Sequence, residues 1–403
     1  MNKIFKRILT VFMVIISLTM LGGCWDSKEF NELFVITATA LDVAEDPKKI
    51  TVTLQTANIP QGAGPSGGNS SGGSGSGGKS GSSSKAVIIL KAESQSLLDG
   101  IMHISRDSNR EVLFQHNQIR IIGKELAQKG IIKHLDMLMR DTHSRLEVPL
   151  AVVDGRAEEV VKAKLSQDPN SGIFLGEMFR DLSRVSNEYQ VRLIDFAQML
   201  IGESVAPIMP MIKLSGSDDK QEIHFVGMAV FKDDKMIGSI DTEETLGLIW
   251  AFGNVKNTNM DVKEEEQNHA VLRIKSFKTK PEVSLEKNGK VKINLDIDVL
   301  TGLGELKGFK EYKMEQLIEH VKKLAEERIK DRINDTLLVA KQMKSDFFRF
   351  GTLISQKHPK EWKRLKKRWE NELFMQVELN VNAKVKIAGS GEIVQSLEKE
   401  EKK

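Results

Sequence analysis

The 403-residue sequence is poor in the residue types on which many binding and catalytic sites depend. It contains a single cysteine, which excludes an intramolecular disulfide and a metal site built from several thiolates. It has only two tyrosines and four tryptophans, so we expect neither an aromatic-lined ligand pocket nor stacking on nucleic acid bases. Lysine and arginine number 59 against 56 aspartates and glutamates, a balance that does not indicate a nucleic acid partner. The motif H-E-x-x-H is missing, and G-x-S-x-G occurs only at 64–68 and 68–72, inside a segment made almost entirely of glycine and serine, so no local signature of a hydrolase stands out from the composition.

The first 23 residues have the pattern of a secretory signal peptide. Basic residues at Lys3, Lys6 and Arg7 precede the uncharged apolar run 8–20. As a helix, the stretch 8–23 would rise about 24 Å, which is less than the roughly 30 Å hydrocarbon core of a bilayer. We therefore predict a lipoprotein signal peptide over 1–23, with an uncleaved anchor or a plain secreted chain as the alternatives.

The end of this segment, Leu21, Gly22, Gly23 and Cys24, resembles a bacterial lipobox. The two glycines allow an extended chain to fit a peptidase groove, and the Cys24 thiol would take up a diacylglyceryl group. Two acyl chains give stable membrane anchoring, whereas one chain binds only marginally. We predict signal peptidase recognition at Leu21, Gly22 and Gly23, lipidation at Cys24, and a mature chain anchored on the extracytoplasmic face of the cell membrane.

A glycine- and serine-rich segment over 61–84 contains a match to the phosphate-binding motif G-x-x-x-x-G-K-[ST], from Gly73 to Ser80. A working phosphate loop follows a buried strand and opens a helix. Here nearly every neighbouring residue is glycine or serine, and the sequence after the match, 85–90, is typical of a strand. We predict a disordered loop over 61–84 between two strands and no bound nucleotide.

The pattern of apolar residues predicts a multi-domain α+β protein in which mixed sheets pack with helices. The expected divisions are an N-terminal α/β domain over 24–164, a helical connector or small middle domain over 165–220, a C-terminal α+β domain over 221–395, and a charged tail over 396–403.

Three local signals support the C-terminal part of this division. Asp233 and Asp234 separate two strand-like stretches and predict a turn. Asp241 and Glu244 have the spacing of a capping box at the start of a helix. One long helix is expected from about residue 308 to residue 345.

Three separated segments carry a resemblance to a known family. Trp25 and Asp26 follow the lipobox cysteine directly, and His116 precedes a predicted strand whose next helix closes with Arg140 and Asp141. The third segment is an Asp-x-Phe-x-Phe-Gly element followed by a proline and two tryptophans, here Asp346, Phe348, Phe350, Gly351, Pro359, Trp362 and Trp369. In this order they resemble the Ger(x)C family, the lipoprotein C subunits of nutrient germinant receptors in endospore-forming bacteria. The resemblance covers essentially the whole mature chain, and the glycine- and serine-rich insertion is the one departure.

The resemblance implies a non-enzymatic receptor subunit without a cofactor. Such a subunit would be tethered to the spore inner membrane beside two integral membrane subunits and needed for triggering germination. The motif residues would then have structural or docking roles. An extracytoplasmic solute-binding lipoprotein of an importer is the alternative function.

The remaining conspicuous residues have ordinary interpretations. No pair among His116, His134 and His143 has the spacing of a helical zinc site, so we predict no metal. The acidic run 264–266 is expected in a solvated loop. Trp362 and Trp369 are seven residues apart and are expected to pack a helix against a sheet. The basic run 360–368 is either a solvated helix face or a surface apposed to a membrane.

Overall fold

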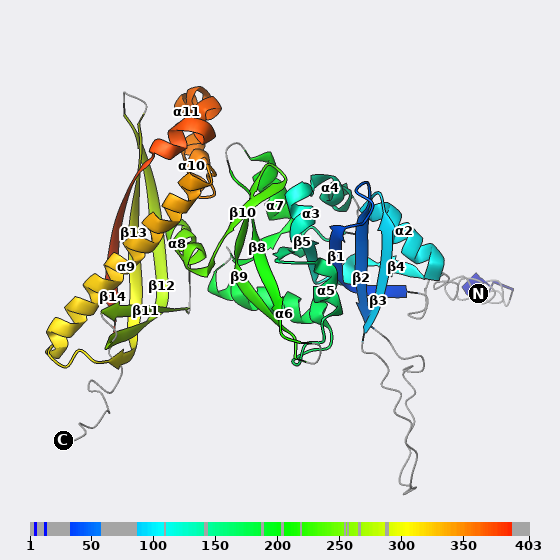
Figure 1. Cartoon of the computed structure of the whole chain (residues 1–403), viewed down its shortest axis with the longest axis horizontal. Coiled ribbons are helices and arrows are strands. Elements are labelled where there is room, and N and C mark those ends of the chain that lie inside the picture. Colours follow the sequence, from blue (N-terminus) through cyan, green and yellow to red (C-terminus); the bar gives the residue numbers. More distant parts are fainter. Residues whose placement is uncertain are drawn as a thin grey trace, which may run out of the picture.

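Two β-sheets with their covering helices follow one another along the long axis of the computed structural model (Figure 1). The structure describes residues 33–57, 87–108, 110–140, 144–186, 189–202, 205–217, 220–253, 255, 258–264, 267–286 and 290–388, together with 4–5 and 12–13. We call residues 33–240 the N-terminal unit and residues 241–388 the C-terminal unit. The lipobox, the loop predicted over 61–84 and the tail predicted over 396–403 lie outside the described residues.

The larger sheet belongs to the N-terminal unit and contains ten strands of the described chain. Its main path runs β10-β9-β8-β6-β5-β1-β2-β3, with β4 paired to β1 and β7 paired to β6. The strands are β1 (Leu33–Val43), β2 (Ile50–Ala57), β3 (Val87–Ser94), β4 (Glu111–Leu113), β5 (Ile119–Gly123), β6 (Pro149–Val153), β7 (Val191–Arg192), β8 (Ile208–Ser215), β9 (Glu222–Lys232) and β10 (Lys235–Ile240). Strands β1, β5, β6 and β8 pair in parallel, and the outer hairpins are antiparallel.

Both faces of this sheet are covered by helices, which explains why its central strands read as unbroken apolar runs. Along β6, Leu150 and Val152 belong to the core on one face, and Ala151 and Val153 belong to the core on the other. One core is covered by α5 (Ala157–Lys162) and α6 (Ser171–Val185). The other is covered by α2 (Leu97–Ser108), α3 (Lys124–Lys129), α4 (Ile132–Arg140) and α7 (Leu193–Ile201).

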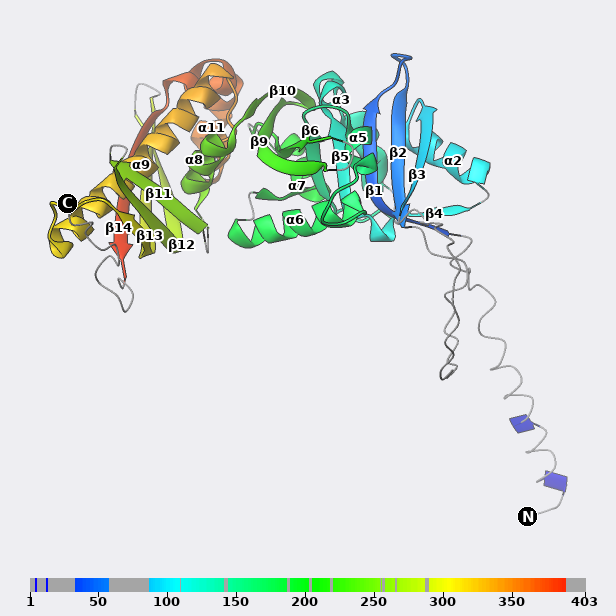
Figure 2. The same cartoon turned by 60° about the horizontal axis from the view of Figure 1, so that its bottom comes forward.

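The smaller sheet belongs to the C-terminal unit and has the strand order β11-β12-β13-β14. Its strands are β11 (Thr258–Glu264), β12 (Asn268–Leu285), β13 (Val291–Lys307) and β14 (Glu378–Ile387), and β14 returns parallel to β13. The long helix α9 (Met314–Gln342) lies along one face of this sheet (Figure 2). The helices α8 (Thr242–Phe252), α10 (Phe350–Lys357) and α11 (Pro359–Leu365) complete the unit.

Helix α9 is shorter than the sequence suggested, although its existence is confirmed. Gly308 and Phe309 both have positive φ angles, of 79° and 57°, so the chain turns before the helix begins at Met314. Within the helix, buried residues recur every three or four positions, namely Leu317, Val321, Ala325, Ile329, Ile333, Leu337 and Ala340. This spacing forms one apolar stripe that packs on the sheet.

The local signals near the junction of the two units are confirmed. Asp233, with φ 54°, lies in the turn between β9 and β10. The side chain of Asp241 accepts a hydrogen bond from the backbone N–H of Glu244, and Glu244 reciprocates, which forms the predicted capping box of α8. The predicted α+β fold class is also confirmed. The division expected at 220/221 falls between β8 and β9, which pair through Ser215 and Glu222 inside one sheet.

Candidate functional site at the junction of the two units

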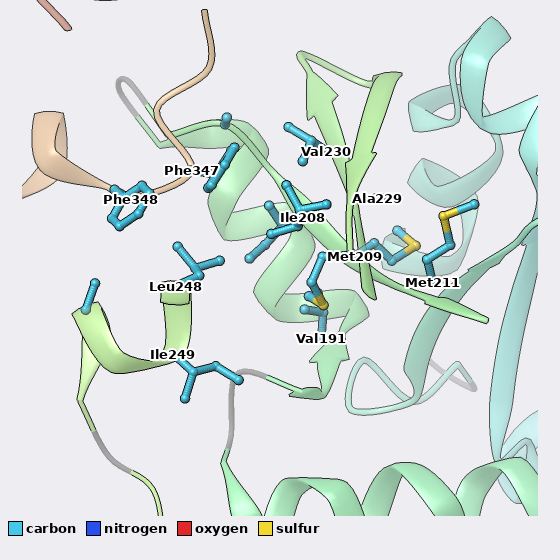
Figure 3. Packing of buried hydrophobic residues seen from close by; sticks show 14 of the residues in the cluster. Val191, Ile208, Met209, Met211, Ala229, Val230, Leu248, Ile249, Phe347 and Phe348 are labelled. Atoms are coloured by element: carbon cyan, nitrogen blue, oxygen red, sulfur yellow. The ribbon is translucent and has the colours of Figure 1, made fainter. Parts of the chain in front are cut away.

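The N-terminal and C-terminal units meet through a continuous hydrophobic cluster (Figure 3). From the C-terminal side, Leu248 and Ile249 of α8 and the rings of Phe347 and Phe348 enter this cluster. From the N-terminal side it receives the apolar residues Val191, Ile208, Met209 and Val230. The junction is thus packed with buried apolar side chains from both units, as a protein interior is. We call this region the joint.

Asp346 organises the C-terminal side of this joint. Its carboxylate accepts hydrogen bonds from the backbone N–H groups of Phe350 (3.1 Å) and Gly351 (2.7 Å) and from the indole N–H of Trp369 (2.8 Å). The side chain therefore satisfies the first turn of α10 and also holds Trp369, 23 residues along the chain. The backbone carbonyl of Asp346 accepts the N–H of Ala206, 3.3 Å away, which links the motif to the N-terminal unit.

The environment of Asp346 opposes its ionisation. The residue is 1% exposed, and burial raises the pKa of its carboxyl group to about 6, although the three N–H donors work to lower it. All three donors belong to this protein, so the carboxylate of Asp346 makes its hydrogen bonds within the fold.

The aromatic residues of the motif pack close to Asp346. The rings of Phe348 and Phe350 lie with their centroids 5.2 Å apart, and Trp362 meets Trp369 edge to face at 5.6 Å. All four are buried. Pro359 occupies the first turn of α11, where its missing N–H removes no helical hydrogen bond. The structure thus brings together six of the seven predicted residues of the third segment, whereas Pro359 is exposed at the start of α11.

The two tryptophans reach each other although no single α-helix connects them. Helix α11 ends at Leu365, and a 3₁₀ turn over Lys366–Arg368 and a π-helical turn over Trp369–Leu373 follow. Both side chains belong to the hydrophobic core, and Trp369 is fully buried. The seven-residue spacing therefore identified the inward-facing residues, but the regular helix that it assumed is absent over 366–373.

A groove of about 750 Å³ opens beside the joint, between α7 and α10. The guanidinium group of Arg192 forms hydrogen bonds of 2.7 and 2.8 Å with the carboxylate of Asp195. From the other wall, the Arg349 guanidinium lies over the Phe252 ring, 4.9 Å from its centre. Although burial acts in the opposite direction, Arg192 and, to a lesser extent, Arg349 hold the pKa of Asp195 below its usual value. Both walls of the groove therefore carry charge.

The residues of the second segment lie away from this joint. His116 is exposed in the 3₁₀ turn Phe114–His116 of the N-terminal unit. Arg140 is exposed at the end of α4 and pairs with Asp136 at 2.8 Å. Asp141 lies outside the described residues, as do Leu21, Gly22, Gly23, Cys24, Trp25 and Asp26. The structure therefore does not bring His116 and Arg140 to the Asp346 motif.

Two buried polar residues of the N-terminal unit carry no motif signal, although each ties the sheet to its helices. The Asp42 carboxylate accepts the N–H groups of Ala157 and Glu158, both at 2.8 Å, and so connects β1 to α5. The Gln55 amide accepts the N–H of Gly172 at 2.8 Å and donates to the carbonyl of Val161 at 2.7 Å. The only sequence signal is a polar side chain inside an apolar strand pattern.

The described part of the chain contains no group of three or more His, Cys, Asp or Glu side chains that could hold a metal ion. His134 is buried on α4, where burial lowers the pKa of its ring to about 4. His143 lies outside the described residues. Among the helices of the described chain, none combines the length and the apolar character that membrane crossing requires.

Two models of known protein families match this chain. The model described as "Spore germination protein N-terminal domain" matches residues 26–214, and the model described as "Spore germination B3/GerAC like, C-terminal" matches residues 226–391. The chain belongs to the Ger(x)C family of spore germination proteins. The two matches adjoin near the β8–β9 hairpin, and the second contains the whole Asp346 motif of this Ger(x)C chain.

Individual relatives are similar over nearly their whole length. Spore germination protein KC of Bacillus subtilis (strain 168) is 22% identical, over 96% of this chain and 96% of the relative. Spore germination protein B3 of the same organism is 22% identical, over 93% and 96%. The crystal structure of the GerBC protein shares the fold, with a TM-score of 0.54 at 17% identity, and the match covers 87% of this chain and 97% of that one.

Proposed function

We propose that this protein is the lipid-anchored, non-enzymatic C subunit of a nutrient germinant receptor on the extracytoplasmic face of the spore inner membrane. The observation that carries the proposal is the match of both Ger(x)C family models, in order, over 26–214 and 226–391. The names of the relatives, among them spore germination proteins A3, B3 and KC, support a place in the germination machinery. Two integral membrane subunits, of the A and B type, would be its partners.

The lipid anchor would hold one particular end of the molecule at the membrane. Cys24 precedes Leu33, the first residue of β1, by nine positions, and an extended chain of that length spans about 30 Å at most. Strands β1–β3 and helix α2 form the end of the molecule that lies away from the C-terminal unit (Figures 1 and 2). This end would therefore lie close to the bilayer and to the extracytoplasmic surfaces of the membrane subunits.

The joint supports a scaffold role in this receptor. The Asp346 carboxylate is occupied by three internal N–H donors, and the motif rings around it are buried. Phe348 and the backbone hydrogen bond from Ala206 to Asp346 connect this part of the C-terminal unit to the N-terminal unit. A subunit of this kind would transmit contacts between membrane subunits and help to convert nutrient binding into dipicolinate release.

The experiment that tests the proposal measures dipicolinate release from spores over a panel of nutrients. Spores that lack this chain, and spores that carry Cys24→Ala, should lose one nutrient response in a strain stripped of related receptors. A deletion of 61–84 is the matched control and should keep that response, because the segment is expected to be a dispensable loop. Normal germination of the null spores with every nutrient in that strain would exclude the receptor role.

The groove between α7 and α10 favours a second candidate, a solute-binding lipoprotein of an importer. It is a cleft between two folded units, and Arg192, Asp195 and Arg349 are among the residues that line it. The two functions differ in their genetic neighbours: a receptor subunit would adjoin genes for multi-pass membrane proteins, whereas an importer would adjoin a permease and an ATPase. The family membership makes the receptor subunit our first choice.

A further inference from the structure

The basic run at the end of the C-terminal unit forms one exposed face. Lys360, Lys363, Arg364 and Lys367 are exposed and follow one another at spacings of three, one and three residues. This is the spacing of residues that share a side of a helical turn. We call these four residues the cationic face.

Two buried tryptophans, one within the run and one just after it, fix the direction of the cationic face. Trp362 is 3% exposed and Trp369 is fully buried, so both rings point away from solvent. The indole N–H of Trp369 is bound to the Asp346 carboxylate, which fixes the end of the segment to the joint. The orientation of the cationic face is therefore set by the core of the C-terminal unit.

Little of the positive charge on this face is neutralised. Within the described chain, none of its four residues forms an ion pair with a carboxylate, and Glu361 is the only acidic residue between them. The neighbouring Arg368 is compensated, because it pairs with Glu372. Four basic groups against one acidic group leave a net charge of +3 on one exposed surface.

The chemistry of this surface fits lipid headgroups better than a protein partner. Protein interfaces usually have an apolar or aromatic centre inside a polar rim. In the stretch 357–368 no large apolar side chain is exposed, since Trp362 is buried and Leu365 is half-buried. A cationic surface without an apolar centre attracts an anionic bilayer, to which each lysine or arginine adds about 1 kcal/mol, or roughly fivefold in affinity.

We propose that the cationic face binds the anionic headgroups of the membrane to which Cys24 is anchored. This inference rests on the membrane location in the proposed function. Helix α11 belongs to the C-terminal unit and lies on the side of that unit nearer the junction, whereas β1–β3 and α2 form the far end of the N-terminal unit (Figures 1 and 2). The lipid anchor and the cationic face therefore give two separate attachment points, one on each unit, so that both units would be held at the bilayer.

The test uses the mature chain with Cys24→Ala, which lacks the acyl chains, and vesicles that contain about 30 mol% phosphatidylglycerol in phosphatidylcholine. This chain should sediment with the anionic vesicles, and its binding should weaken as the salt concentration is raised. It should not bind vesicles of pure phosphatidylcholine. A triple variant, Lys363→Gln, Arg364→Gln and Lys367→Gln, should lower the partition coefficient about a hundredfold. The matched control replaces the same number of exposed cations on the outer surface of the smaller sheet, with Lys278→Gln, Lys384→Gln and Lys386→Gln, and should bind nearly as well as the parent.

A second readout reports which surface touches the lipid. The Cys24→Ala chain is free of cysteine, so Glu361→Cys or Ser276→Cys supplies one labelling site each, beside the cationic face and on β12. A polarity-sensitive dye should change its emission with anionic vesicles at position 361 and stay unchanged at position 276.

Three outcomes would overturn the inference. These are full vesicle binding by the triple variant, an equal loss in the control variant, and dye responses of the same size at both positions. If the triple variant keeps its vesicle binding but no longer co-purifies with membrane subunits, the face binds an acidic protein surface, and the lipid assignment is wrong. None of these measurements depends on germination, so a failure of the receptor assignment would appear separately, in the dipicolinate assay.

Discussion

Replacing Asp346 with alanine is expected to lower the free energy of unfolding by about 3 kcal/mol at pH 7. The variant leaves three buried N–H donors without an acceptor: those of Phe350, Gly351 and the Trp369 indole. At about 2 kcal/mol for each unsatisfied donor, this costs about 6 kcal/mol. The variant also removes a buried charge. Burial raises the pKa of Asp346 from 3.8 to about 6, which corresponds to about 3 kcal/mol of destabilisation that the parent carries at neutral pH. The alanine variant is relieved of this destabilisation, so its net loss is the difference, about 3 kcal/mol.

The same reasoning predicts how the effect depends on pH. Because the folded-state pKa of Asp346 lies above its unfolded value, the stabilisation by the protonated form is complete below pH 3.8 and is lost as the pH rises through 6. The difference in unfolding free energy between parent and Asp346→Ala should therefore grow from about 3 kcal/mol at pH 7 to about 6 kcal/mol near pH 4.

The assay is denaturant unfolding of the mature chain, followed by tryptophan fluorescence and by circular dichroism, at both pH values. Trp369→Phe serves as a partial control, because it removes one donor and keeps an aromatic ring in the core. Asp136→Ala, at an exposed ion pair on α4, should have no measurable effect. A difference below about 1 kcal/mol at pH 7 would refute the role of the three donors. A difference that grows as the pH rises would show that the donors outweigh burial in setting the pKa.

Other consequences of the structure can be tested in the same way. Burial lowers the pKa of His134 to about 4, so the unfolding free energy should rise by about 3 kcal/mol because of this residue as the pH is raised from 4 to 6.5. His134→Gln should not show this rise. If the variant keeps the pH profile of the parent, the burial of a neutral ring is contradicted. Gly172→Ala should lower the thermal midpoint, because a Cβ there would meet the backbone of Thr37 at 2.8 Å, and overpacking of this kind costs about 1–3 kcal/mol. Gly302→Ala is the control, since the nearest atom to its Cβ would be 3.5 Å away. Equal midpoints for the two variants would argue against tight packing of α6 on β1. Phe348→Ala should cost about 3–5 kcal/mol and expose the joint to proteolysis, and a chain that resists protease as the parent does would show that the two units meet without this ring.

The parts of the fold that local sequence decides were predictable. A capping box needs only Asp241 and Glu244 at the right spacing, and the β9–β10 turn needs only residues that favour turns. The buried stripe of α9 follows from apolar residues at every third or fourth position. The family motifs were also readable, because they are short and occur in a fixed order.

The role of the Asp346 motif could be predicted only in part. Its members were named from the sequence, but the three donors of Asp346 come from two neighbouring residues and from Trp369. The groove between α7 and α10 gave no sequence signal, because its two walls come from distant parts of the chain. Arg349 and Met199, which meet across it through a long hydrogen bond to the Met199 sulfur, are 150 positions apart.

The sequence by itself therefore determined the local elements and the family, since each depends on residues that are close neighbours in the chain, and it predicts a lipidation signal on the same basis. The tertiary structure decided which elements share a sheet and which polar groups are buried. Strands β9 and β10 have an unremarkable local pattern, yet they extend the N-terminal sheet because β8 offers a free edge to pair with. Asp42 reads as an ordinary acidic residue and Asp346 only as one member of a family motif, until packing removes water from both and supplies N–H donors from distant elements. Such contacts are non-local, so their energies appear only when the whole chain has folded.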